Sequence, residues 1–225
     1  MIRMLDDMPP REEIVGRLYT AVLSDVLDTL GCFDQAMRPF IRPLDEARVL
    51  FGRARNGLYM NIYHVPQDRN PYALEIALVD DLKPGEVAVL ACGGPSVRIA
   101  PWGELLTTAA RCRGAAGCVT DGLVRDIQRI RAMEFPVFHG GIGPLDSKGR
   151  GEMVAIDVPV VCGGARVDPG DLIFGDADGV IVLPRAVAAA AVRAALAKIS
   201  AEDATRAALL GGKTLHEVYA TFGVL

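Results

Sequence analysis

The sequence predicts a mixed α/β protein, because short apolar runs alternate along the chain with segments whose apolar residues recur at helical spacing. Runs of this length, bounded by Gly, Pro and polar residues, are typical of buried strands. The clearest of them are VAVLAC, AAGCVTD, FPVF and VIVLP. A length of 225 residues is compatible with one large domain or with two small ones.

The composition is that of an ordinary globular protein, with 51% hydrophobic and 23% charged residues. The net charge is −4 and the basic residues are scattered, so nothing indicates a nucleic-acid partner, and no apolar run approaches the length of a membrane span. The N-terminus carries acids where a signal peptide needs a cationic and then an apolar run, so we expect a cytoplasmic protein. The five cysteines form no CxxC pair and are expected to be small core residues.

Residues 11–30 are predicted to form one amphipathic packing helix. Apolar residues return about every fourth position, and Gly31 is suited to end the helix. At the other end of the chain, residues 185–210 are rich in alanine and predict a helix that breaks at Gly211–Gly212. We expect the apolar segment that follows to dock on its own domain or on a neighbour.

The turn at 83–85 introduces the strand VAVLAC, and the Gly-Pro-rich segment GGPSVRIAPW follows that strand. Glycines there either let the backbone approach a ligand or simply turn a corner. No GxGxxG or GxxxxGK[ST] pattern is present, so a nucleotide site has little support. Arg98 in this segment is either a contact for the far end of an acidic substrate or a surface arginine.

The stretch GELLTTAARCRGAAGCVTDGLVRD predicts a helix, a strand and a second helix start in close succession. The first helix begins near Gly103 and ends at Gly114. The strand should then deliver Asp121 to a turn at Gly122, and Arg125 and Asp126 should open the next helix.

Two neighbouring helix starts would form an anion site, because their first amides have no partners within the helix. Leu105 and Leu106 would offer amides to a carboxylate, and Arg125 would bind the same group as a fork. The acids Glu104, Asp121 and Asp126 would remain to hold a divalent cation. The alternative is that Glu104 and Asp126 only complement helix dipoles, with Arg125 as their ion-pair partner.

Residues 136–153 are predicted to form a long glycine-rich loop after the strand FPVF, and loops of that length are often functional. His139 stands at the expected end of that strand, where it would line the far end of the substrate pocket or act as a general acid or base; the alternative is an exposed or hydrogen-bonded bystander. Downstream, GDADG lacks the ligand spacing of an EF-hand and predicts a tight turn between two strands.

Glu104 is followed by twenty residues and then by Arg125–Asp126, and with this spacing the chain resembles the RraA-like proteins. These include the 4-hydroxy-4-methyl-2-oxoglutarate / 4-carboxy-4-hydroxy-2-oxoadipate aldolases. The resemblance extends from about Leu50 to the C-terminus and includes FPVF and VDPGDLIFGDADGVIVLP. It implies a single domain over residues 1–225, an α-β-β-α sandwich around a swivelling ββα-type core, and assembly as a homotrimer or hexamer.

The resemblance also implies roles for individual residues. Asp126 would bind Mg²⁺ or Mn²⁺, and Arg125 with the backbone of Gly103, Leu105 and Leu106 would hold a pyruvyl carboxylate. Members of the family also take a glutamate from a neighbouring subunit into the metal site. In this chain the resemblance assigns that role to Glu202, which would reach the metal through water. The simpler alternative is that Glu202 is a surface residue near Arg206 on its own helix.

Two positions depart from the aldolase pattern. Arg129 stands where the aldolases often have another acid, and Glu104 stands where they commonly have Asp. A glutamate can still reach a metal through water, but an arginine cannot replace a carboxylate ligand. We therefore expect a metal site shaped for a different substrate.

Together these observations predict a divalent-metal-dependent lyase that cleaves a carbon–carbon bond in a pyruvyl-containing acid, by retro-aldol release of pyruvate or by oxaloacetate decarboxylation. The four lysines lie in turns, a loop and the C-terminal helical region, which disfavours an imine-forming enzyme. Glu104 or Asp121 would orient the water that takes the substrate hydroxyl proton. The alternative from another class is a non-catalytic regulator that binds an RNase E-type ribonuclease, since the resembling family includes such proteins.

Overall fold

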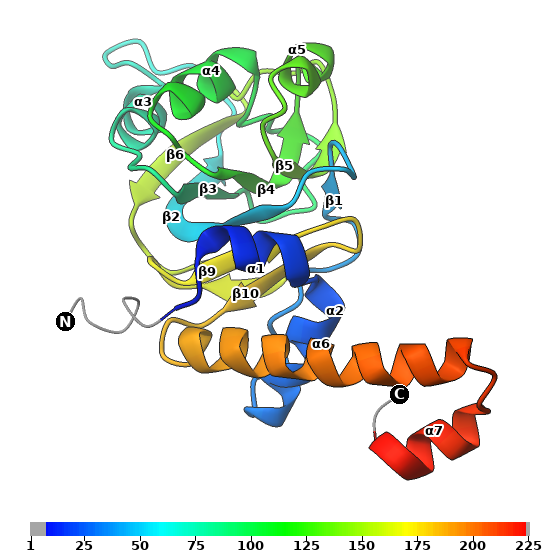
Figure 1. Cartoon of the computed structure of the whole chain (residues 1–225). Helices are drawn as coiled ribbons and strands as arrows, with labels where there is room; N and C mark the ends of the chain where they lie inside the picture. Colours follow the sequence, from blue (N-terminus) through cyan, green and yellow to red (C-terminus); the bar gives the residue numbers. More distant parts are fainter. Residues whose placement is uncertain (1–7, 224–225) are drawn as a thin grey trace.

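The computed structural model describes residues 8–223, which form a mixed α/β fold around an eight-stranded sheet (Figure 1). The sheet has the order β1-β5-β4-β3-β2-β9-β10, with β6 paired to β2. Its strands are β1 (Arg42–Pro43), β2 (Leu50–Asn61), β3 (Glu86–Ala91), β4 (Gly117–Val124), β5 (Val137–Ile142), β6 (Gly151–Ile156), β9 (Leu172–Gly175) and β10 (Val180–Leu183). A separate hairpin joins β7 (Val160–Cys162) to β8 (Ala165–Val167). The helices are α1 (Arg11–Arg17), α2 (Thr20–Thr29), α3 (Ala73–Asp80), α4 (Glu104–Cys112), α5 (Ile127–Ala132), α6 (Ala188–Leu210) and α7 (Leu215–Phe222).

Strand β2 connects the two halves of the sheet. Along its middle it runs parallel to β3, while β9 and then β6 pair antiparallel with its two ends. Strands β3, β4 and β5 are parallel to one another, so their carboxyl ends lie at one edge of the sheet. Loops at such an edge commonly form binding sites in α/β proteins.

Three hydrophobic clusters define the layers. The first packs α3, α4 and α5 on one face of β3, β4 and β5, and includes Leu78, Ala110 and Ile130. The second fills the space between those strands and β9–β10, with Phe138 near its centre. The third packs α1, α2 and α6 against the outer face of β9 and β10 (Figure 1). The expected α-β-β-α sandwich is therefore confirmed.

The N-terminal helix predicted over residues 11–30 is two helices. Leu18 and Tyr19 adopt extended backbone conformations between α1 and α2. The carboxylate of Asp176 then accepts bonds from the Thr20 amide at 2.7 Å and from the Thr20 hydroxyl at 2.8 Å, which stabilises a new helix start. Periodicity did not reveal this break, because the apolar stripe continues across it and the capping acid comes from the distant turn after β9.

Two further boundaries differ from the sequence prediction. Strand β4 does not turn at Gly122; it continues to Val124, with a shift in its pairing to β5 after Thr120. A side chain at position 122 would meet Cys92 Sγ and Pro101 Cδ at 2.9 Å, so this glycine serves close packing within the strand. Strand β5 extends to Ile142, and the predicted long loop is reduced to residues 143–150.

The C-terminal helices agree with the prediction, with a break at Gly211–Gly212 between α6 and α7. A reciprocal capping box between Thr214 and Glu217 begins α7, which folds back beside the end of α6 (Figure 1). Within residues 8–223, no helix is both long enough and apolar enough to cross a membrane.

Candidate functional site

The two predicted helix starts lie side by side. The segment before α4 forms a parallel bridge between Trp102 and Val124, and the Arg125 amide donates to the Trp102 carbonyl at 3.1 Å. The Asp126 carboxylate then accepts the Glu104 amide at 3.2 Å. One acid from the end of β4 thus satisfies the first free amide of α4.

Asp126 has a left-handed backbone conformation, with φ at 59°. Aspartate is one of the few non-glycine residues that visit this region often. Although Asp126 precedes α5, its side chain makes no capping bond to that helix. It turns towards α4 instead, so the backbone conformation serves the contact between the two helix starts.

Gly103 allows this close approach. A Cβ atom at this position would lie 2.9 Å from Asp126 Oδ2 and 3.1 Å from Arg125 Nε. The φ of Gly103 is −153°, an extended value open to any residue. The requirement for glycine is therefore steric and comes from the two functional side chains.

The amides of Leu105 and Leu106 are available to a ligand. Thr107 N bonds to the Gly103 carbonyl and Glu104 N to Asp126, but within the described residues no acceptor faces the two leucine amides. The positive end of the α4 dipole adds to their attraction for an anion. The two amides are thus free as expected for a helix start, and their binding of a carboxylate stays a prediction.

Arg125 stands between two acids at a pocket of about 430 Å³. Its Nε lies 3.8 Å from Asp126 Oδ2, and its Nη1 lies 3.8 Å from Asp146 Oδ1. Both distances exceed that of a hydrogen bond, so the guanidinium donors remain free for a bidentate partner. The pocket is lined by Arg125, Asp126, Ile127, Ile142, Gly143 and Pro144.

Sequence reasoning missed Asp146 and Tyr72. The Tyr72 hydroxyl donates to Asp146 Oδ2 at 2.7 Å, so an acid from the loop after β5 and a tyrosine just before α3 meet beside Arg125. Burial, followed by the bond to Asp146, raises the pKa of Tyr72 to about 12. The sequence pointed to Asp146 only indirectly, because this residue lies in the long glycine-rich loop that was predicted to be functional.

Glu104 does not join Asp126 in a direct cluster. Its carboxylate accepts the Thr108 hydroxyl one turn further along α4, at 3.1 Å. Among residues 8–223, no three His, Cys, Asp or Glu side chains are grouped closely enough to hold a metal ion. Among the described residues that line the pocket, Asp126 is the one acid, and its side chain is partly exposed.

The structure does not bring Asp121 to the site. Its side chain is buried, with Oδ1 accepting the Cys92 amide at 2.6 Å and Oδ2 the Gly94 amide at 2.9 Å. Because β4 continues past Gly122, Asp121 lies within the strand and holds the loop after β3. Both of its oxygens are occupied by structural bonds, which is inconsistent with the predicted catalytic role.

Arg98 also differs from the prediction. Its guanidinium lies over the Tyr63 ring, 4.5 Å from the centroid, and donates to the Ile62 carbonyl at 3.3 Å. The described residues that line the Arg125 pocket do not include Arg98. The contacts of Arg98 tie the loop after β2 to the segment before α4.

His139 lies inside β5 rather than at its end, and only 8% of its surface is exposed. It does not line the Arg125 pocket. Burial, with a smaller effect from the charge of Arg131, lowers the pKa of His139 to about 4. The imidazole is therefore neutral near pH 7, and its position favours a role in the fold.

His139 should make the fold sensitive to acid. Its folded pKa of about 4 lies below the usual 6.5, so between these values the unfolded chain binds more protons and stability rises with pH. The contribution of neutral His139 to the free energy of unfolding is complete above pH 6.5 and is lost as pH falls towards 4. By pH 5 the free energy of unfolding is lower by roughly 2 kcal/mol. Urea titrations of the wild type and His139→Gln at pH 5 and 7 should show a smaller pH dependence in the variant. Equal pH dependence would contradict this assignment.

Within one chain, Glu202 lies on α6 and accepts a bond from the Tyr19 hydroxyl, with Lys198 at 3.8 Å. Asp203, next to it, pairs with Arg206. These contacts explain Glu202 as a partly buried residue of its own subunit. Its predicted contribution to a neighbouring subunit remains a prediction.

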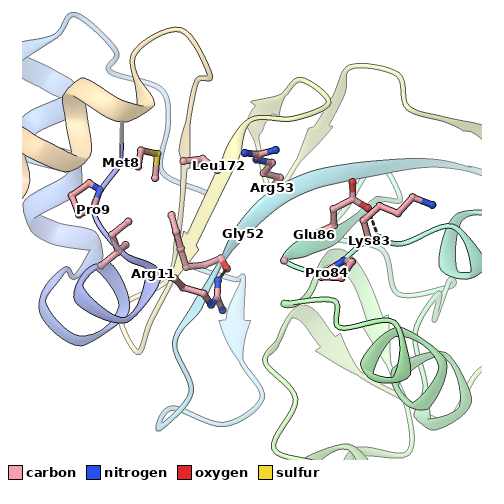
Figure 2. Close-up of a pocket in the computed structure, with 12 residues that line it drawn as sticks. Met8, Pro9, Arg11, Gly52, Arg53, Lys83, Pro84, Glu86 and Leu172 are labelled. Atoms are coloured by element: carbon pink, nitrogen blue, oxygen red, sulfur yellow. Dashed lines mark hydrogen bonds between the residues drawn. The ribbon is translucent and has the colours of Figure 1, made fainter. Parts of the chain in front are cut away.

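A larger pocket of about 520 Å³ lies where α1 meets β2 and the turn before β3 (Figure 2). Arg11, Arg53 and Lys83 lie along it. Its acid, Glu86, already accepts the Lys83 amide at 2.8 Å. Among its described lining residues three cations outnumber this one acid, so the helix starts beside Arg125 remain the better candidate for metal-dependent chemistry.

Comparison with known proteins shows the family of this chain. A model of the RraA-like family, described as Aldolase/RraA, matches residues 20–182. The chain belongs to the RraA-like family. Within it, a relative from Halalkalibacterium halodurans, called a putative 4-hydroxy-4-methyl-2-oxoglutarate aldolase, is 37% identical over 74% of this chain and 72% of its own length.

Two solved structures share the fold of this RraA-like chain. An uncharacterized protein from Pseudomonas syringae pv. tomato is 28% identical, with a TM-score of 0.79 over 94% of this chain and 98% of the other. Streptomyces coelicolor RraAS2, described as an unusual member of the RNase ES inhibitor RraA protein family, is 30% identical, with a TM-score of 0.75. That alignment covers 88% of this chain and 98% of RraAS2.

Proposed function

We propose that this RraA-like protein is a divalent-metal-dependent lyase that cleaves a carbon–carbon bond in a pyruvyl-containing acid, either by retro-aldol release of pyruvate or by decarboxylation of oxaloacetate. The observation that carries the proposal is the convergence of Arg125 with the free amides of Leu105 and Leu106 beside the carboxylate of Asp126. The aldolase name of the Halalkalibacterium relative supports it.

The donor set fits Mg²⁺ or Mn²⁺. Asp126 Oδ2 bonds to the Glu104 amide, whereas Oδ1 has no bond within the described residues and its side chain is 44% exposed. Mg²⁺ usually keeps several waters and takes only one or two protein carboxylates together with substrate oxygens. A site with one direct ligand suits that preference, with Glu104 acting through water.

The residues of this chain would divide the chemistry as follows. Arg125 binds the substrate carboxylate as a fork, and the amides of Leu105 and Leu106 bind its remaining lone pairs. When bound, the cation polarises the 2-oxo group and stabilises the negative charge of the enolate. Because the donors of Arg125, Leu105 and Leu106 are held in place before the reaction, they stabilise the developing charge without having to move. Glu104 holds the water through which the hydroxyl proton leaves the substrate.

The family resemblance leads us to propose a homotrimer or hexamer in which Glu202 of one subunit approaches the water shell at Asp126 of the next. Exposed apolar side chains near the pocket support a subunit boundary there: Leu105 is 76% exposed and Ile142 is 52% exposed. These residues have the character of a surface that a second copy covers.

The function is tested with a panel of 2-oxo acids. We expect pyruvate release from 4-hydroxy-4-methyl-2-oxoglutarate, or carbon dioxide release from oxaloacetate, that needs Mg²⁺ or Mn²⁺ and stops with a chelator. Turnover that is indifferent to the chelator would rule out the metal. No turnover with any member of the panel would rule out the lyase.

The second candidate function is regulation of an RNase E-type ribonuclease, which the structural similarity to RraAS2 favours. A regulator would inhibit RNA cleavage by such a ribonuclease in proportion to the complex formed. Inhibition without any metal-dependent turnover of the 2-oxo acids would favour this function over the lyase.

A further inference from the structure

The loop between β5 and β6 carries an acid that faces Arg125. Asp146, in the turn between β5 and β6, is the second acid beside the guanidinium. At 3.8 Å its charge attracts Arg125 without using a hydrogen-bond donor. Asp126 Oδ2 lies at the same distance from Nε, so two different nitrogens of Arg125 each have an acid nearby while their donors stay available.

Asp146 is itself held in place. The Tyr72 hydroxyl binds Oδ2, while the Ser147 hydroxyl and the Lys148 amide each lie 3.5 Å from Oδ1. Arg150 donates to the Asp146 carbonyl at 3.4 Å. Burial alone would raise the pKa of Asp146, but the bond from Tyr72, the loop amides and the charge of Arg125 together lower it.

Tyr72 lies next to a helix that packs into the core. It immediately precedes α3, which carries Leu78 into the core. One turn into that helix, the buried Glu75 accepts the Tyr59 hydroxyl from β2. The hydroxyl that orients Asp146 is therefore presented by a helix fastened to the central strand.

We propose that Asp146 and Tyr72 are positioning residues for the substrate-binding arginine. Tyr72 holds Asp146, and Asp146 keeps the Arg125 guanidinium away from Asp126 and open to the substrate carboxylate. The inference rests on the proposed function for its kinetic consequence. Its structural basis, the chain of contacts from Tyr72 to Arg125, exists in the free protein.

Losing the charge at Asp146 leaves Asp126 as the remaining acid beside Arg125. The guanidinium then moves towards Asp126 and competes with the cation for its carboxylate. We expect Asp146→Asn to raise KM for the 2-oxo acid about tenfold and to raise the Mg²⁺ concentration needed for half-maximal activity, with a smaller change in kcat. Tyr72→Phe should act in the same direction.

The experiment compares Asp146→Asn, Tyr72→Phe and their double variant with two controls. Asp203→Asn removes an acid that pairs with Arg206 on the surface of α6, and Tyr219→Phe alters an exposed tyrosine on α7. If Tyr72 acts through Asp146, the double variant should resemble Asp146→Asn rather than sum the two effects. The controls should retain the wild-type KM.

A second measurement does not depend on activity. With tyrosine labelled at ¹³Cζ, the pKa of Tyr72 should be about 12 in the wild type and clearly lower in Asp146→Asn. An unchanged Tyr72 pKa would overturn the contact, and an unchanged KM in an active enzyme would overturn the positioning role. An inactive wild type whose Tyr72 pKa responds as expected would instead count against the lyase.

Discussion

Replacing Asp126 by asparagine is expected to abolish metal-dependent turnover, with a loss of at least about 10²–10³ in kcat/KM, the range typical for removing one fixed electrostatic partner. Asparagine tolerates the left-handed backbone at this position, and its amide oxygen can still accept the Glu104 amide. The substitution therefore removes the charge while preserving the contact between the two helix starts. Initial rates across a Mg²⁺ titration measure the loss.

Asp126→Ala provides the comparison for stability. It removes the bond to Glu104 N as well as the charge, and it places alanine at a positive φ. We expect it to lower the free energy of unfolding by roughly 1–2 kcal/mol more than the asparagine variant does. Full activity in Asp126→Asn, with the wild-type metal requirement, would show that the site lies elsewhere.

The same variant addresses the subunit boundary. If Glu202 completes the site of a neighbouring chain, inactive Asp126→Ala and Glu202→Ala chains should recover part of the activity in mixed oligomers, since some sites then contain both native acids. A fully active Glu202→Ala protein would leave this residue with the role that its bonds to Tyr19 and Lys198 indicate.

Gly103→Ala is expected to reduce kcat/KM by about ten- to a hundredfold while the protein remains folded. The new methyl group would lie 2.9 Å from Asp126 Oδ2 and 3.1 Å from Arg125 Nε, so both side chains must move. Displacements of this size are costly for catalysis because the reacting groups must be held closely. The protein should stay folded because the extended backbone at position 103 is open to alanine, although glycine is preferred over alanine at a helix N-cap and some stability is lost.

Gly16→Ala is the matched control. Gly16 lies in α1, where an added Cβ would meet no atom within 4 Å. This variant should retain full activity and gain slightly in stability from the helix propensity of alanine. If Gly103→Ala had the same kinetics as Gly16→Ala, Asp126 and Arg125 would not need their observed positions.

Local sequence signals were sufficient for the framework of the site. The helix from Gly103 to Gly114 and the Arg125–Asp126 helix start are encoded by neighbouring residues, so their prediction is confirmed by α4 and α5. The free amides of Leu105 and Leu106 follow from helix geometry alone. The anion-site hypothesis requires these two starts to converge, and the bond from the Glu104 amide to Asp126 shows that they do.

The errors share a physical origin in contacts between distant segments. The role of Asp121 depends on amides of the loop after β3, twenty-seven or more positions earlier in the chain. The break before α2 depends on Asp176, and the position of Arg125 depends on Asp146, which is itself held by Tyr72. The two residues of each pair are far apart in the sequence, so local periodicity and motif spacing could not indicate that they are in contact.

The pocket beside Arg125 has walls of two different origins. The charged wall comes from the end of β4, whereas Ile142, Gly143 and Pro144 come from the end of β5 and the loop that follows it. Under the proposed function, the residues for chemistry and those for selectivity would lie in separate stretches of the sequence. If the protein is the proposed lyase, exchanging the residues around Ile142 to Pro144 would alter which acids enter while Arg125 and Asp126 stay unchanged, so one scaffold could acquire new substrates through changes in a single short segment.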